Sequence, residues 1–123
     1  MLLDTHVLLW FLQDSPHLPA DLAHSIEQAP VVTVSVASLW EIAIKQGLGR
    51  LSVPADFLDT VRLSGLTVLP ITAEHAMAAG RLPWLHRDPF DRMLVAVSQV
   101  DRLALVSADP QVLSYQTIVV DAR

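Results

Sequence analysis

The opening stretch MLLDTHVLLWFL, Met1–Leu12, decides the fold. Its first apolar pair, Leu2-Leu3, ends on Asp4, and the run Val7–Leu12 is apolar all round. This pattern predicts a short buried strand, a turn and then a helix. A strand that passes directly into a helix is the repeating unit of open α/β sheets.

The same alternation of strand and helix continues along the chain. Apolar spacing and Gly or Pro stops predict helices over Pro19–Ala29, Val36–Gln46, Pro54–Leu63, Ala73–Arg81 and Pro89–Val100. Short apolar runs predict further strands at Val31–Val34, Thr67–Ile71, Leu103–Val106 and Thr117–Val120. Such alternation implies parallel pairing with right-handed crossovers. We therefore expect a single three-layer α/β domain over residues 1–123, with a central parallel sheet of about five strands and helices on both faces.

Local signals mark several ends of these elements. Ser35 and Thr72 are good N-caps for the helices that follow them. Pro70 predicts that its strand ends there or lies at an edge of the sheet. Asp88-Pro89 begins the long helix with an acid before a proline at the first helical position. No internal repeat, linker or low-complexity tract interrupts this organisation.

The composition is unusually apolar for a small domain. Hydrophobic residues make up 52% of the chain and charged residues 17%, against about 25% charged in typical globular proteins. So much apolar surface is hard to bury in a domain of this size. We therefore expect an exposed apolar patch that a second copy or another protein covers.

Other features of the composition narrow the compartment and the partners. The chain has no cysteine, which excludes disulfides and thiolate metal sites. The longest apolar run, Val7–Leu12, is far shorter than the ~20 residues that span a bilayer. The first residues lack the basic region of a signal peptide, so we expect a cytoplasmic protein that does not enter membranes. A net charge of −5 argues against a general nucleic-acid binder unless a bound cation offsets part of it.

Four acids lie close to the ends of predicted strands or on the helices that follow them. Asp4 and Asp109 follow strands, Asp91 lies near the start of the long helix, and Glu41 lies on the helix Val36–Gln46. In an open α/β sheet, ligands bind outside the carboxyl ends of the strands. Carboxylates that converge there repel one another unless a cation offsets their charge. The joint pattern predicts a site for a hard metal ion and therefore points to phosphoryl chemistry.

Each acid also has a purely structural interpretation. Asp4 could form an Asx-turn or cap a helix. Glu41 could form a solvated i, i+4 pair with Lys45, worth roughly 0.2–0.5 kcal/mol. Asp88 and Asp109 each precede a proline and could be helix caps. Because Pro89 has no N–H, a capping Asp88 must accept from the next amides, which leaves Asp91 free to project toward the sheet.

The remaining chemistry-bearing residues form no motif that is strong in sequence. The five histidines are scattered, and no HExxH, glycine-rich phosphate loop or GxSxG elbow is present. Trp10, Trp40 and Trp84 are interpreted as core or interface residues rather than as platforms for stacking bases. A zinc hydrolase and a serine hydrolase therefore have little support.

Four segments together resemble the PIN-domain family, and most closely its VapC-type toxins of bacterial toxin–antitoxin pairs. They are LLDTHVLLW at Leu2–Trp10, SVASLWEIAIKQGLGRL at Ser35–Leu51, HRDPFDRMLVAVSQ at His86–Gln99 and LVSADPQV at Leu105–Val112. The resemblance covers the whole chain in order. It implies a PIN-like fold and a metal-dependent ribonuclease that uses Mg²⁺ or Mn²⁺.

The resemblance also implies roles for the acids. Asp4 and Asp91 match family acids that we expect to bind the metal directly. Glu41 matches the helix acid, and Asp109 matches a fourth, more variable acid that acts through water. Asp88 matches an acid found only in the HRDPFDR-like branch, and we expect it to be mainly a cap with at most a water-mediated metal contact. The number of metal ions, one or two, stays open.

The expected partners are an RNA substrate, a small antitoxin protein and a second copy of the chain. Two alternatives come from other classes. A catalytically silent PIN-like module would bind its partner without turnover. A phospho-acceptor domain would need an adjacent acidic pair after the first strand and a late lysine, and neither Leu3-Asp4-Thr5 nor Leu105–Pro110 supplies them. A dehalogenase-type phosphatase would need a DxD pair, which Asp4-Thr5-His6 lacks.

Overall fold

A five-stranded parallel sheet forms the centre of the protein in a computed structural model that describes residues 1–115 and 119–123. The strand order is β3-β2-β1-β4-β5. The strands are β1 (Leu2–Leu3), β2 (Thr33–Ser35), β3 (Thr67–Leu69), β4 (Leu105–Ser107) and β5 (Val119–Asp121). Leu2 is in register with Thr33 on one side and with Leu105 on the other. The predicted parallel sheet is confirmed, with β1 at its centre.

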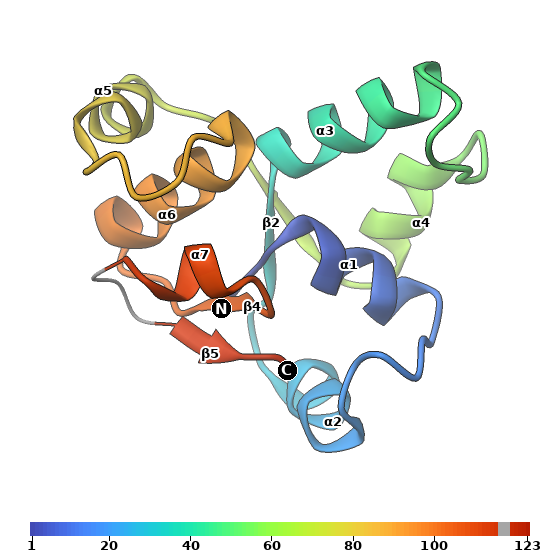
Figure 1. The fold of residues 1–123 in the computed structure, drawn as a ribbon. Coiled ribbons are helices and arrows are strands. Elements are labelled where there is room, and N and C mark those ends of the chain that lie inside the picture. Colours follow the sequence, from blue (N-terminus) through green and yellow to red (C-terminus); the bar gives the residue numbers. More distant parts are fainter. Residues whose placement is uncertain (116–118) are drawn as a thin grey trace.

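The helices cover the two faces of this sheet (Figure 1). They are α1 (Thr5–Leu12), α2 (Ala20–Gln28), α3 (Val36–Gly47), α4 (Phe57–Leu63), α5 (Ala73–Arg81), α6 (Pro89–Asp101) and α7 (Pro110–Leu113). Successive strand residues point to opposite faces. Leu3 and Val106 therefore pack with α1 to α4, while Leu2 and Leu105 pack with α5 to α7. Two apolar cores, one on each face, give the expected three layers.

The predicted caps are present. The Ser35 hydroxyl accepts from the Ala37 N–H at 3.0 Å at the start of α3. Thr72 begins α5 with a capping box, in which its hydroxyl accepts from the His75 N–H and the His75 ring accepts from the Thr72 N–H. These contacts satisfy N–H groups that the first turn of a helix leaves without partners.

Several boundaries differ from the sequence prediction. β2 and β4 extend to Ser35 and Ser107, because these hydroxyls hydrogen-bond to the next helix or turn and so tolerate burial. α4 begins at Phe57 rather than Pro54, and Asp56 makes no side-chain cap bond. The short helix α7 was not predicted. Of the predicted strand Thr117–Val120, the first two residues lie outside the described residues.

Two further expectations concern the edge of the sheet and the membrane. β3 lies at an edge and ends just before Pro70, as predicted. Among the described residues, no helix is long and apolar enough to cross a bilayer.

Candidate metal and active site

The acids approach one another at the carboxyl edge of the sheet. Asp4 directly follows β1, and Asp109 lies two residues after β4, the neighbour of β1. Asp91 is in the first turn of α6, and Glu41 is on α3. The chain leaves β1 toward β2 on one side and β4 pairs on the other, so β1 is the point at which the strand order reverses. Open α/β sheets bind ligands in the crevice at such a point.

Asp4 is almost fully buried at this edge. Its Oδ1 accepts from the Val7 N–H at 2.8 Å, which caps α1. Burial raises the pKa of Asp4, while a hydrogen bond from Ser107 and the bond from Val7 lower it, and the charge of nearby Asp109 raises it. The cap that the structural interpretation predicted is therefore real. It does not exclude a functional role, because the second oxygen, Oδ2, takes no part in the cap.

Asp91 is the second acid with a strongly perturbed environment. Burial raises its pKa to about 6, a hydrogen bond from His86 lowers it, and the charges of Asp88 and Asp109 raise it. The His86 Nε2 atom lies 2.7 Å from the Asp91 Oδ2 atom. A carboxylate desolvated beside other acids is a site that gains from a cation.

Among the described residues, His86, Asp91 and Asp109 have ligand atoms close enough together to hold one cation. One ligand atom from each lies within 4.8 Å of the others, and His86 Nε2 is 3.9 Å from Asp109 Oδ2. Two carboxylates and one imidazole suit Mn²⁺, and two carboxylates completed by water suit Mg²⁺. The donors present therefore fit the cation that the sequence predicted.

His86 is a site residue that the sequence prediction missed. The histidines were judged scattered, since none has a paired-ligand spacing. Its position could have indicated this role, because His86 precedes Asp88 and Asp91 in the segment HRDPFDR. A residue just before a helix N-terminus is placed to contact side chains of the first helical turn.

Neither Glu41 nor Asp4 belongs to this group of three, and Glu41 is linked instead to the residue that follows Asp4. Its Oε1 accepts from the Thr5 hydroxyl at 2.6 Å, and Thr5 follows Asp4 in the chain. Lys45 Nζ lies 2.9 Å from Glu41 Oε2, so the i, i+4 pair exists. Glu41 is only 6% exposed, so the pair is not the solvated surface pair of the structural interpretation. Its carboxylate faces the turn that begins α1.

The sequence model of the PIN domain matches residues 1–116. The chain belongs to the PIN-domain family. This confirms the family that the four sequence segments predicted.

Solved structures show the same fold. A toxin–antitoxin complex from Klebsiella pneumoniae matches with a TM-score of 0.71 at 17% identity, covering 99% of this chain and 97% of that chain. VapBC2 from Rickettsia felis, bound to a DNA fragment from its promoter, matches with a TM-score of 0.73 at 14% identity, covering 98% of this chain and 96% of that chain. No curated protein matches the chain significantly.

Asp88 caps α6 in this PIN domain, as its position before Pro89 predicted. Its Oδ1 accepts from the N–H groups of Phe90 at 2.9 Å and Asp91 at 3.0 Å. The carboxylate is thereby drawn onto the end of the helix.

We expect the substitution Asp88→Ala to cost about 0.5–2 kcal/mol in the free energy of unfolding, because two amide N–H groups lose their acceptor. Denaturant unfolding of the metal-free PIN domain measures this cost. Asp56→Ala is the matched control, since Asp56 precedes α4 without a side-chain cap bond. Equal costs for the two variants would contradict the capping role.

The loop that carries His86 is held by Arg92. This side chain is 4% exposed, and its guanidinium lies 3.8 Å from the centre of the Trp84 ring. It donates to four backbone carbonyls, those of Ala79, Leu82, Pro83 and His86. Arg92 thus joins the end of α5 and the following loop to α6.

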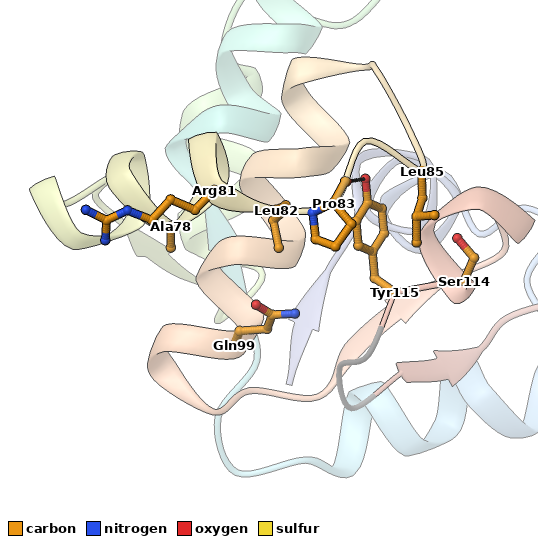
Figure 2. A pocket seen from close by; sticks show the side chains of 8 residues that line it. All are labelled: Ala78, Arg81, Leu82, Pro83, Leu85, Gln99, Ser114 and Tyr115. Atoms are coloured by element: carbon orange, nitrogen blue, oxygen red, sulfur yellow. Dashed lines mark hydrogen bonds between the residues drawn. The ribbon is translucent and has the colours of Figure 1, made fainter.

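Tyr115 holds the same loop from the other side. Its hydroxyl donates to the Pro83 carbonyl at 2.9 Å, the bond drawn in Figure 2, and accepts from the His86 N–H at 3.0 Å. A cavity of about 850 Å³ lies between this loop, α5, α6 and the residues Ser114 and Tyr115. No acid is among the described residues that line it, so these residues do not offer the cation ligands of the site.

The pKa values of Asp4 and Asp91 predict how the stability of the metal-free PIN domain depends on pH. Both pKa values are raised in the folded protein, so the folded state binds protons more tightly than the unfolded state. Their contribution to stability is present below pH 3.8 and is lost as the pH rises through about 6 for Asp91. Two pKa units correspond to roughly 3 kcal/mol, and partial exposure of Asp91 reduces this to about 1–2 kcal/mol.

We therefore expect Asp91→Asn to be more stable than the wild type in chelator at pH 7, with a difference that shrinks toward pH 4. Comparing the melting temperatures of the two proteins across this range cancels the titration of all other groups. Parallel curves would show that ionised Asp91 is not destabilising in the metal-free fold.

Proposed function

We propose that this PIN domain is a divalent-metal-dependent ribonuclease and acts as the toxin of a toxin–antitoxin pair. The observation that carries the proposal is the meeting of acids from β1, β4 and α6 at one edge of the sheet, together with His86. Two of these acids are desolvated enough to have raised pKa values. Such a cluster favours a cation, and a cation there would attract the phosphate of RNA despite the net charge of −5.

We assign the direct metal contacts to Asp4 and Asp91, and water-mediated contacts to Glu41 and Asp109, with Asp88 mainly a cap. When bound, Mg²⁺ or Mn²⁺ supplies an activated water and stabilises charge on the phosphate. His86 orients the Asp91 carboxylate through its 2.7 Å contact. Thr5 and Lys45 hold the buried Glu41 carboxylate in place.

The antitoxin proposal is supported by an exposed apolar stripe that runs along α3 and ends on Leu48, the residue after the helix. Val36, Trp40, Ile44 and Leu48 follow one another at intervals of four residues and are 37%, 60%, 37% and 61% exposed. Beside them, a groove of about 180 Å³ runs between α3 and α4. Apolar area of this kind is rare on a monomer surface, and the two structural relatives described above are toxin–antitoxin complexes. We propose that a small antitoxin and a second copy cover such surfaces in the cytoplasm.

The test is cleavage of RNA by the purified protein. We expect the wild type to cut single-stranded RNA with Mg²⁺ or Mn²⁺ and to lose this activity in excess chelator. The variant Asp4→Asn should keep the fold and cut no RNA, with or without chelator. Mapping RNA ends after induction in cells, beside the Asp4→Asn control, would identify the target.

The alternative function, a silent binding module, makes the opposite prediction. It requires that the wild type and Asp4→Asn bind the same partner and that neither cuts RNA with any metal. Full cleavage in chelator would instead contradict the metal mechanism.

A further inference from the structure

A row of aromatic rings begins beside the acids at the start of α1. The His6 and Trp10 ring centres are 6.2 Å apart with their planes at 43°. The Trp10 and His17 ring centres are 5.7 Å apart with their planes at 31°. Both distances lie in the range in which aromatic rings attract one another. The row runs from the metal-site edge along α1 and onto the segment that follows it.

The first two rings share a pocket with the acids. A pocket of about 280 Å³ is lined by Asp4, His6, Trp10, Ala108 and Asp109. One wall is acidic and belongs to the candidate metal site, and the other wall is aromatic.

The sequence interpretation placed Trp10 in the core or an interface, and the structure adds a second contact to the core contact. The ring does pack against the apolar core on the α1 side of the sheet. Its other part lines the pocket with Asp4 and Asp109. His6 and Trp10 are four residues apart and therefore lie on the same face of α1. Packing against the core holds this aromatic wall in a fixed orientation next to the acids.

An aromatic wall beside a phosphate site has the chemistry of a base-binding subsite. Proteins recognise single-stranded RNA by stacking unpaired bases on aromatic or histidine side chains. Such stacking tolerates any base, because every base has a π-face. In a nucleotide the base lies next to its own phosphate, so a phosphate at the acids would bring a base to the neighbouring wall.

We propose that the pocket formed by His6 and Trp10 with Asp4 and Asp109 is a stacking subsite for one unpaired nucleobase next to the phosphate that is cut. The inference rests on the proposed ribonuclease function and adds the subsite that selects single-stranded RNA. A paired base stays in its own stack and does not enter the pocket. His17 extends the row for the next nucleotide.

The test measures binding of a short single-stranded RNA that carries 2-aminopurine, a fluorescent base that stacking quenches. The protein is the full chain with Glu41→Gln, which lies outside the pocket and is expected to stop cleavage, and Mn²⁺ is present. We expect binding with quenching when 2-aminopurine occupies one position of the RNA. Trp10→Leu should weaken binding roughly 5- to 150-fold, the loss of one stacked base. Trp10→Phe should retain most of the affinity, and His6→Ala should lose part of it.

Two controls separate stacking from general effects. His24→Ala removes another exposed histidine, on α2 and outside the row, and should bind like the parent. An RNA with an abasic residue at the quenched position should bind all variants equally. If Trp10→Leu proves unstable, the exposed His6 and the conservative Trp10→Phe still decide the question.

The outcomes also distinguish failure of the stacking subsite from failure of the proposed ribonuclease function. Wild-type protein that cuts no RNA with any divalent metal overturns the ribonuclease proposal and the subsite with it. Wild-type protein that cuts RNA, while His6→Ala and folded Trp10→Leu bind and quench like the parent, overturns the subsite alone. Equal cleavage of duplex and single-stranded RNA would also overturn it.

Discussion

Replacing Asp91 with asparagine is expected to abolish Mn²⁺ binding and RNA cleavage by this PIN domain. Asp91 is held by His86 at 2.7 Å and shares the candidate cation site with Asp109. Its carboxylate projects from the first turn of α6, while the neighbouring Asp88 is occupied with two amide N–H groups. Because we propose Asp91 as a direct ligand, its loss should lower metal affinity by more than the roughly 10- to 100-fold that outer partners cost.

Calorimetry with Mn²⁺ measures this difference, and Asp88→Ala is the matched comparison. We expect Asp88→Ala to bind Mn²⁺ and keep appreciable activity at saturating metal, at a cost in stability. Asp91→Asn should fold at least as stably as the wild type and bind no metal. Binding that is lost in Asp88→Ala and kept in Asp91→Asn would show that the two acids have been assigned the wrong way round.

The second large effect is expected at Arg92. Substitution by methionine removes the donor to four backbone carbonyls and the contact with Trp84. Buried polar groups left without partners cost about 1–3 kcal/mol each, although Tyr115 also donates to some of these carbonyls. We expect Arg92→Met to lower the free energy of unfolding by about 3–5 kcal/mol.

Arg92→Lys separates the stability effect from the effect on the site. Lysine keeps the charge but lacks the planar fork that reaches both ends of the loop. We expect it to fold and to bind Mn²⁺ about 10- to 100-fold more weakly, because the loop no longer fixes His86. Arg102→Lys, at an exposed position after α6, is the control and should change neither property. If folded Arg92→Lys binds metal with unchanged affinity, the contacts of Arg92 with the loop are not needed to position His86.

Much of the fold follows from local patterns in the sequence. Leu2-Leu3 before Asp4, the caps at Ser35 and Thr72, and Asp88-Pro89 are strong local signals, and each marks an element that is present. Boundaries at β2 and β4 differ because buried serines take their hydrogen-bond partners from the next helix or turn. A pattern of apolar residues does not show these hydrogen bonds, so it ends each predicted strand before the serine.

The site was only partly predictable for the same reason. Acids at strand ends converge by topology, so Asp4 and Asp109 could be placed together from order alone. His86 and Arg92 depend on a loop that contacts α5, α6 and Tyr115, residues far apart in the sequence. Trp10 serves the core and the pocket at once. The contacts of this loop and the two contacts of Trp10 follow no periodic pattern, so they could not be predicted from the sequence.

Because β1 lies at the centre of the sheet, the acidic cluster can form only late in the synthesis of the chain. Leu2 of β1 pairs with Leu105 of β4, so this pairing cannot form until Leu105 has been synthesised. Asp4 and Asp109 come close together only after the two strands have paired. At about 5–20 residues per second, a ribosome needs several seconds to make the intervening chain. In the proposed ribonuclease, the acids from β1 and β4 therefore come together only late in synthesis. The apolar stripe on α3 and the groove beside α4, which we propose as partner surfaces, are synthesised earlier than Asp109.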